Sequence, residues 1–457
     1  MSLEREGQGE REDPAGGDAE RMSAEEMIEL TRRYTMFSWV AQHAAEPIAM
    51  ETAKGAWFTS ADGVRYLDFN SQAMSVNIGH GDVRVAKAIA DQAYKLAYAY
   101  PHAAHEPRAR LGRRLAGLTP GDLDVMFFTT GGAVANDMAI KLARQYTGRQ
   151  KIMARYRSYH GATGQAMVAT GDPRRWANEV GAAAIVRVPD AHRYGRRDPE
   201  PVERSLADLE EVIMFEGPHT IAGFLLEPVV GANGILIPPD GYMQGVREIC
   251  DRYGILLIAD EVMSGFGRTG KWFAVEHWGV VPDLMTMGKG ITSSYVPFGA
   301  VAERRPNADA IADEPFFGGL TYHSHPLGCA CALAVIDVYD HDGLIERSAR
   351  MGEVMRAHNE RLMEKHPSVG THRNIGLFGV LELVRDRATF EAMAPYNGTS
   401  PEMKRVHQYM RGHGLFALTR WNTIQLNPPL IISEDEMAHA YDIIDAALYL
   451  ADEGYRG

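Results

Sequence analysis

The chain has 457 residues, of which 45% are apolar and 23% charged, a balance typical of a globular protein large enough for two domains. Its formal net charge of −13 argues against a nucleic-acid-binding protein, and no uncharged apolar run is long enough to predict a membrane span. The three cysteines, Cys250, Cys329 and Cys331, lack metal-ligand spacing and favour a reduced, cytoplasmic location.

The N-terminal part of the chain begins with a polar tail. Residues 1–22 are charged, rich in glycine and nearly free of large apolar side chains, so we expect them to be disordered or loosely ordered, without a secretory signal. The next segment, SAEEMIELTRRY, predicts a short helix capped by Ser23. GAWFTSADGVRYLDFN then predicts a β-hairpin with its turn at Ala61 to Gly63.

Residues 82–340 alternate between helical and strand-like patterns. Helical stretches such as VRVAKAIADQAYKLAY and ANDMAIKLARQYTG alternate with the apolar runs DVMFFTT, KIMAR, AGFLLEPV, ILLIADEV and DLMTMGK. Near-continuous apolar strands separated by helices predict a parallel sheet covered on both faces. After residue 340 the pattern is a long amphipathic helix, the strand GLFGVLELV and a final helix, EDEMAHAYDIIDAALYLADE.

These patterns predict an α/β protein with two domains. The large domain, residues 82–340, has a mostly parallel central sheet. A small α+β domain is built from both chain ends, residues 23–81 and 341–457.

The stretch LLIADEVMSGFGRTG contains a literal G-x-G-x-x-G at Gly265, Gly267 and Gly270. A dinucleotide-binding fingerprint needs its glycines to open a helix near the first strand of the chain. Here they lie past the middle of the chain and precede KWFAVEHWGVVPD, a poor crossover helix. We therefore reject a dinucleotide site.

Two residues in this region point to different chemistry. Asp260 ends a buried strand, where open α/β sheets place their ligands. Lys289 follows the strand DLMTM between Gly288 and Gly290, and a desolvated lysine there can form a Schiff base. A Schiff-base lysine together with a carboxylate for a pyridinium nitrogen is what pyridoxal 5′-phosphate (PLP) requires.

From about Tyr34 to the C-terminus the sequence resembles the class III, or ω-, aminotransferases, PLP-dependent enzymes of fold type I. The matching motifs, in family order, are FFTTGGAVANDMAIKLAR, YRSYHGAT, LLEPVVGANGILIPPDGY, IADEVMSGFGRTGKWFA, MGKGI and GGLTYHSHPLGCACALAVI. The segments YTMFSWVAQ, SYHGATGQAMVATGDPRRWANE and LTRWNTIQLNPPL resemble most closely the taurine:pyruvate and taurine:2-oxoglutarate aminotransferases.

The resemblance implies roles for residues around the cofactor ring. Lys289 binds PLP covalently and moves a proton once substrate has displaced it, and Asp260 pairs with the pyridinium nitrogen. Val262 packs on one face of the ring and Tyr159 stacks on the other, with His160 beside it.

It implies further roles around the phosphate and the substrate. Gly132 and Ala133 offer backbone N–H groups to the phosphate at a helix N-terminus. Glu227 lies near the phenolic oxygen of the cofactor and the substrate. Thr321 reaches the phosphate of the partner subunit, which implies a homodimer, or dimers paired into a tetramer, with active sites at the interface.

Four residues are candidates for substrate binding. Phe37 and Trp39 are expected to form pocket walls, and Arg420 is expected to clamp a carboxylate or sulfonate, with Trp421 beside it. The histidine pairs in HAAH and HSH lack the further ligands of a metal site, so we expect no metal.

The chain departs from the family pattern at three places. Val134 stands where the family often has a glutamate, Met263 replaces a common glutamine, and His323-Ser324 replaces Ser-Gly at the expected dimer entrance. Phosphate binding relies on backbone donors, so Val134 should not abolish it.

The predicted function is a ping-pong transfer of an amino group from an ω-amino donor, such as taurine, to pyruvate or 2-oxoglutarate. One alternative is an amine:pyruvate aminotransferase acting on uncharged primary amines. A PLP-dependent decarboxylase or aminomutase on the same scaffold is a second alternative, and a PLP-binding protein without catalysis is a third.

Overall fold

The computed structural model describes residues 22–193 and 195–457, so the predicted tail, apart from its last residue, lies outside the described residues. The chain divides into two compact units. The first contains the chain up to Thr52 together with Thr59–Val64, and the second contains Ala53–Phe58 together with Arg65–Gly457. The domain boundaries predicted after residues 81 and 340 remain predictions.

The first unit contains the predicted N-terminal helix. α1 (Ala24–Tyr34) begins after Ser23, whose side-chain oxygen accepts a hydrogen bond from the Glu26 N–H at 3.1 Å. This confirms the predicted cap. The short 3₁₀ helix η1 (Gln42–Ala44) and the strand β1 (Met50–Lys54) follow.

The predicted hairpin turn is present. β2 (Trp57–Ser60) and β3 (Arg65–Asp68) flank the turn at residues 61–63. The Ser60 N–H donates to the carbonyl of Val64 at 2.9 Å and closes the turn.

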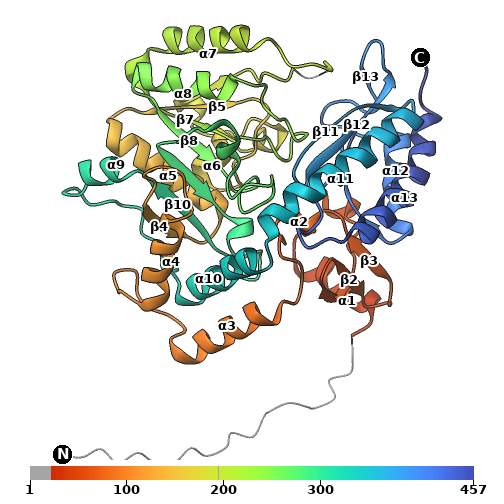
Figure 1. Ribbon diagram of the computed structural model, residues 1–457, viewed down its shortest axis with the longest axis horizontal. Coiled ribbons are helices and arrows are strands. Elements are labelled where there is room, and N and C mark those ends of the chain that lie inside the picture. The colour runs from red at the N-terminus through yellow and green to blue at the C-terminus, as the bar shows by residue number, and fades with distance from the viewer. Residues whose placement is uncertain (1–21, 194) are drawn as a thin grey trace, which may run out of the picture. The chain divides into compact units, whose positions relative to one another are not determined.

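A 7-stranded sheet with the order β4-β10-β9-β8-β7-β5-β6 forms the centre of the second unit (Figure 1). The strands are β4 (Val125–Thr129), β5 (Lys151–Arg155), β6 (Ile185–Val188), β7 (Ile221–Leu226), β8 (Leu256–Asp260), β9 (Leu284–Met287) and β10 (Gly299–Glu303). Neighbours from β9 through to β6 are parallel, and β10 is antiparallel to both β9 and β4. The mostly parallel sheet is therefore as predicted.

Hydrophobic side chains leave both faces of this sheet because successive strand residues point in opposite directions. Ile152, Leu225 and Ile258 pack with α5 (Gly132–Thr147) on one face. On the other face, the neighbouring strand residues pack with α7 (Val202–Glu216) and α8 (Tyr242–Tyr253). The remaining helices of this part of the chain are α2 (Ser71–Met74), α3 (Val83–Lys95), α4 (Glu106–Ala116), α6 (Gly164–Ala169), α9 (Arg305–Ala310) and α10 (Pro326–His341).

The C-terminal part of the second unit has its own sheet, with the order β11-β12-β16-β15. Figure 1 shows the helices α11, α12 and α13 gathered around β11 and β12. The elements are α11 (Leu344–Lys365), β11 (Val369–Ile375), β12 (Phe378–Asp386), β13 (Glu391–Ala392), α12 (Pro401–Gly412), β14 (Leu415–Phe416), β15 (Leu418–Arg420), β16 (Thr423–Leu426) and α13 (Glu434–Asp452). β14 pairs in parallel with β3, so early and late segments of the chain share this α+β part, as predicted.

The G-x-G-x-x-G segment serves packing. β8 is followed by turns and the 3₁₀ helix η5 (Ala274–Trp278), with no crossover helix opening at the glycines. Gly267 and Gly270 have φ of +83° and +84°, and a Cβ on them would come within 2.7 Å of Ile345 Cδ1 and 3.0 Å of the Ala349 Cα. These glycines therefore allow α11 to approach the loop closely.

Among residues 22–193 and 195–457, no helix has both the length and the apolar composition needed to cross a membrane.

Candidate active site

Lys289 lies two residues beyond the end of β9 and opens the 3₁₀ helix η6 (Lys289–Ile291), which two glycines allow to pack tightly. A Cβ on Gly288 would lie 3.1 Å from the Gly132 backbone nitrogen, and one on Gly290 would lie 2.7 Å from Phe266 Cβ. Lys289 itself has a φ of 42°, the left-handed region that a lysine rarely adopts. The close packing of the surrounding backbone thus fixes the position from which the Lys289 side chain extends.

The electrostatic surroundings of Lys289 suit a nucleophilic amine. Burial lowers the pKa of the Lys289 ammonium, the carboxylates of Asp260 and Glu227 oppose that shift, and the guanidinium of Arg174 adds to it. A lowered pKa increases the fraction of neutral amine available for covalent bonding to a carbonyl group.

Asp260 is the last residue of β8 and is buried. Its Oδ2 accepts hydrogen bonds from His160 Nδ1 at 2.7 Å and from Asn136 Nδ2 at 2.8 Å. Its Oδ1 accepts from the Val262 N–H at 3.1 Å. The single hydroxyl proton of Thr286 is directed at Asn136 Oδ1 at 2.7 Å, so its 3.4 Å contact with Asp260 Oδ1 is secondary.

This arrangement fits the ring nitrogen that PLP would present. A carboxylate has about four lone-pair positions, and three donors leave Asp260 with acceptor capacity for one more N–H. Sequence reasoning identified Asp260 and His160 but missed Asn136 and Thr286. The available signal was weak: Asn136 is a polar residue on the buried face of α5, and Thr286 interrupts the apolar strand LMTM.

The N-terminus of α5 supplies uncapped backbone donors beside this cluster. Its N-cap, Gly131, provides no side-chain hydrogen bond, so the N–H groups of the first turn, including those of Gly132 and Ala133, are free of a side-chain cap. A Cβ on Gly132 would lie 2.6 Å from Val262 Cγ1, and one on Gly161 would lie 2.7 Å from the Ala133 Cα. A helix N-terminus with free N–H groups is an anion site, as the phosphate of PLP requires.

Glu227 follows β7 and holds Tyr159 in position. Its Oε1 accepts from the Tyr159 N–H at 3.0 Å and its Oε2 from the Gly231 N–H at 2.8 Å. Burial raises the pKa of Glu227. Met263 packs against Gly231, where any larger residue would collide with its sulfur, so the methionine fills space in a position where the family often has glutamine.

A second cluster adjoins Tyr159 and contains two arginines. The Arg174 guanidinium carbon lies 3.4 Å from the centroid of the Tyr159 ring. Arg174 NH2 lies 2.5 Å from Asp172 Oδ2, and Arg420 NH2 lies 3.1 Å from the same oxygen. Arg420 also packs on Trp421, with 4.6 Å between its guanidinium carbon and the ring centroid.

Arg420 and Trp421 thus lie in the neighbourhood of Tyr159, whereas sequence reasoning missed Arg174 and Asp172. The segment GDPRRW gives only a local signal, an Asp-Pro start to the 3₁₀ helix η2 (Pro173–Arg175).

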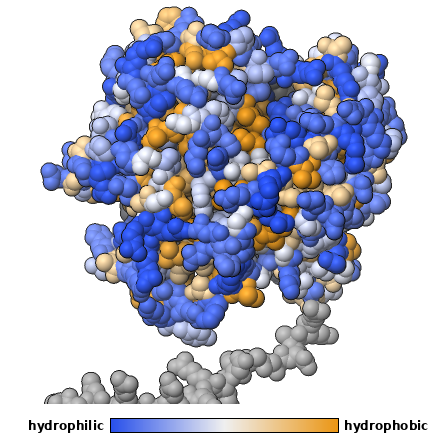
Figure 2. Space-filling model, viewed as in Figure 1, coloured by the Kyte–Doolittle hydropathy of each residue, from blue (hydrophilic) through white to orange (hydrophobic). Residues whose placement is uncertain are grey.

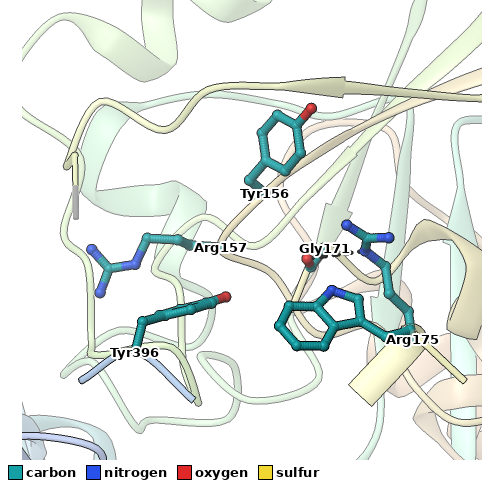
Figure 3. Close-up of a pocket in the computed structure, with 6 residues that line it drawn as sticks. Tyr156, Arg157, Gly171, Arg175 and Tyr396 are labelled. Carbon is teal, nitrogen blue, oxygen red and sulfur yellow. Dashed lines mark hydrogen bonds between the residues drawn. The ribbon is translucent and has the colours of Figure 1, made fainter. Parts of the chain in front are cut away.

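A cavity of about 320 Å³ borders this second cluster. It is lined by Tyr156, Arg157, Gly171, Arg175, Trp176 and Tyr396 (Figure 3). Gly171 precedes Asp172, and the Tyr396 ring lies 4.4 Å from the Trp421 ring. The cavity therefore adjoins the arginine cluster rather than Lys289.

For Thr321, Phe37 and Trp39, the structure shows local surroundings only. Thr321 is exposed in a turn, where its carbonyl accepts from the Tyr98 hydroxyl at 2.9 Å. Phe37 and Trp39 belong to the first unit, in which the Phe37 backbone exchanges two hydrogen bonds with the Gln42 side chain and Trp39 is exposed. Their roles remain predictions.

The histidines considered as metal ligands have other partners. His102 stacks on Tyr100, His105 bonds to the Ser324 carbonyl, His323 bonds to the Phe128 carbonyl and His325 caps α10. Over residues 22–193 and 195–457, no three His, Cys, Asp or Glu side chains gather in a way that could hold a metal ion.

Comparison with known proteins identifies relatives along nearly the whole chain. Residues 40–448 match the family Aminotransferase class-III. The solved structure of a taurine:2-oxoglutarate aminotransferase from Bifidobacterium kashiwanohense, in complex with PLP and glutamate, is 38% identical with a TM-score of 0.92, covering 95% of this chain and 99% of that one.

Two curated relatives illustrate the range of activities in the family. A taurine–pyruvate aminotransferase of Bilophila wadsworthia is 31% identical over 94% of this chain and 98% of its own. An isoleucine 2-epimerase of Lentilactobacillus buchneri is 34% identical over 89% of this chain and 91% of its own.

Proposed function

Because the chain belongs to the class III aminotransferases, whose cofactor is PLP, we propose that it transfers an amino group from an acid-bearing ω-amino donor to a 2-oxo acid. The observation that carries the donor class is the pair of arginines, Arg174 and Arg420, beside Tyr159.

The residues that would hold PLP are those of the first cluster. Lys289 would carry it, Asp260 would pair with its ring nitrogen, and the first turn of α5 at Gly132 and Ala133 would bind its phosphate. Val262 and Tyr159 would cover the two ring faces. Bound there, PLP supplies an electron sink for the charge left on a substrate carbon when a proton is removed.

Each of these side chains has a separate role in transamination. Lys289 Nζ, with its lowered pKa, takes and returns the proton on the amino-bearing carbon. The buried hydrogen bonds from His160 and Asn136 fix the direction of the Asp260 carboxylate. Glu227 holds the backbone of Tyr159.

The acid group of the donor would meet Arg174 or Arg420. Guanidinium groups bind carboxylate and sulfonate oxygens through paired N–H donors. Relatives named for taurine, one using pyruvate and one using 2-oxoglutarate, support an ω-amino acid such as taurine as donor and either 2-oxo acid as acceptor. Donor and acceptor would use the same site in turn, in a ping-pong mechanism.

A second candidate donor is an uncharged primary amine. The cavity beside the arginine cluster is lined by three aromatic side chains, Tyr156, Trp176 and Tyr396, which suit an apolar or aromatic substituent. One relative is an isoleucine 2-epimerase, so a reaction without transfer of the amino group to a second substrate is a further candidate. Decarboxylation and amino-group migration are reactions of the same kind.

We further propose that the enzyme is a homodimer with shared active sites. Thr321 is exposed, and large side chains around it are exposed as well: Phe317 by 85%, Tyr322 by 60% and Tyr100 by 63%. Figure 2 shows hydrophobic side chains gathered in patches on a largely hydrophilic face. The exposed aromatic side chains named above suit contact with a partner copy.

The cysteines Cys250, Cys329 and Cys331, all free and buried, support a reduced, cytoplasmic location.

The test of donor class is a half-reaction panel on the purified PLP-bound enzyme. Taurine, β-alanine, γ-aminobutyrate and 1-phenylethylamine are each added, and the decay of the visible absorbance of the bound cofactor is recorded. We expect acid-bearing donors to react fastest and the absorbance to return on adding pyruvate or 2-oxoglutarate. Reaction with uncharged amines alone would favour the second candidate. An amino product formed without any 2-oxo acid would indicate isomerase or decarboxylase chemistry.

Lys289→Ala tests the cofactor assignment. The variant should lose the visible absorbance and nearly all turnover. Lys271→Ala, which changes an exposed lysine of the same unit, should keep both. Normal transamination by Lys289→Ala would refute the proposal.

Subunit complementation tests the shared site. Lys289→Ala and Thr321→Asp chains, each inactive alone, are unfolded together and refolded. If Thr321 serves the partner, mixed dimers contain one site with both residues intact and regain activity. No recovery in mixed dimers, with each chain shown to assemble, would refute the sharing.

A further inference from the structure

The Asp172 carboxylate is the centre of the arginine cluster. Its side chain has no exposed surface, whereas those of Arg174 and Arg420 are 19% and 22% exposed. Besides the two arginines, it accepts a weaker contact from Asn233 Nδ2 at 3.3 Å and the Arg174 N–H at 3.0 Å. It is therefore a buried anion between two partly buried cations.

The charges of this cluster do not cancel. Two guanidinium groups and one carboxylate leave a net charge of about +1, and a partly buried cation without a counter-ion is costly. With Asp172 between them, an uncharged ligand can occupy the site without facing two uncompensated cations.

The two arginines are held unequally. Arg174 donates two hydrogen bonds to Asp172 Oδ2, one from Nε at 2.9 Å and one from NH2. Arg420 donates one hydrogen bond to Asp172, from NH2 at 3.1 Å, and within the described residues its buried Nε has no hydrogen-bond partner. Arg420 is therefore the arginine that can exchange Asp172 for the acid group of a ligand, while Arg174 stays in place.

We propose that Asp172 is a specificity-determining residue, a resident anion that compensates Arg420 when the donor is uncharged and yields Arg420 when a ligand brings an acid group. The inference rests on the proposed function and deepens it, since it explains how one site admits both acid-bearing and uncharged amines. Asp172 competes inside the protein with every anionic ligand, so it limits the affinity for acids.

The decisive variant is Asp172→Asn, which removes the charge but keeps the oxygen that caps η2. We expect the ratio of kcat/KM for an acid-bearing donor to that for 1-phenylethylamine to rise about 10-fold or more, through a lower KM for the acid and a higher one for the amine. Acetate should inhibit the variant with an inhibition constant about 10-fold lower, whichever donor is used. An unchanged or lower ratio, or unchanged acetate inhibition, would overturn the proposal.

Two further variants separate charge from structure. Asp172→Glu restores the charge and should return the ratio towards the wild-type value. Glu179→Gln removes a carboxylate from the same segment, where it pairs with Arg175 and Arg187, and should leave the ratio unchanged. If the wild type reacts with no amine at all, the proposed function fails. If it reacts but Asp172→Asn does not alter the ratio, only the present inference fails.

Discussion

Asp260 Oδ2 and His160 Nδ1 lie 2.7 Å apart although the two residues are separated by 100 positions in the chain. Asn136 joins them, because its amide donates both to Asp260 Oδ2 and to the His160 carbonyl, at 2.8 and 2.7 Å. All three side chains are buried. Hydrogen bonds from His160 and Asn136 thus fix the orientation of the Asp260 carboxylate, which we assign to the cofactor ring.

Replacement of Asp260 by asparagine should remove the charge that keeps a ring nitrogen protonated. We expect kcat to fall about 100-fold or more, a loss typical of removing one strong electrostatic contact in an active site. The visible absorbance of the cofactor should persist because Lys289 is intact. Asp251→Asn, at a largely exposed carboxylate, is the control and should retain wild-type kcat. An Asp260→Asn enzyme with normal kcat would show that this carboxylate has no electronic role.

Gly132→Ala should weaken PLP binding. The added Cβ would lie 2.6 Å from Val262 Cγ1, so the first turn of α5 must move from its neighbours. We expect the dissociation constant for PLP, measured by fluorescence titration of the apoenzyme, to rise about 10-fold or more.

The neighbouring glycine is a matched control for this change. A Cβ on Gly131 meets nothing within 4 Å, and its φ of 164° is extended, so Gly131→Ala should leave the dissociation constant close to wild type. Adding Val262→Ala to Gly132→Ala should recover part of the loss. Equal effects of the two glycine substitutions would argue against the steric explanation.

His366 should make stability depend on pH. Its side chain is fully buried between Asp452, 2.7 Å from Nδ1, and Asp445, 3.1 Å from Nε2. Burial alone would lower the pKa of His366, but the two carboxylates outweigh it and raise the pKa above 6.5. A raised folded-state pKa contributes stability that is full below pH 6.5 and is lost as the pH rises through the folded value.

Burial raises the pKa of both aspartates, but hydrogen bonds outweigh it and lower the pKa below 3.8: those from Lys365 and His366 to Asp445, and those from His366 and Ser368 to Asp452. The stability that the two carboxylates contribute is therefore present above pH 3.8 and is lost as the pH falls through their lowered pKa values. His366→Gln should therefore cost about 2 kcal/mol near pH 5.5 and less near pH 9, measured by denaturant unfolding. Lys365→Ala, which removes an exposed ion pair to Asp445, should cost much less than His366→Gln because solvent screens that pair. A cost for His366→Gln that is the same at both pH values would contradict the assignment of a charged imidazole.

Met263→Gln, which restores a residue common in the family, should destabilise this protein. Met263 is buried and packs against Gly231, and a primary amide placed there would lose its hydration. We expect a loss of about 1–3 kcal/mol in the free energy of unfolding, against less than about 1.5 kcal/mol for Met263→Leu. A Met263→Gln protein as stable as the leucine variant would indicate that a polar partner is within reach of this position.

Local features of the sequence were sufficient for much of the fold and part of the site. Ser23 caps α1, and the runs KIMAR, ILLIADEV and DLMTMGK form strands, because capping, periodicity and chain breaks act over a few residues. Asp260 and Lys289 were predicted for the same reason, since Asp260 ends one apolar strand and Lys289 closely follows another. The short strands β6 and β10 were missed, as IVRV and GAVAE carry little pattern of their own.

What only the tertiary structure decided is which side chains meet. The strand order places β8 between β7 and β9, so Asp260 comes to lie near Glu227 and Thr286, while α5 brings Asn136 from a distant part of the chain. Arg420 reaches Asp172 across 248 positions. No local pattern encodes such contacts, because they depend on strand order and packing, and the charge balance of the arginine cluster depends on them in turn.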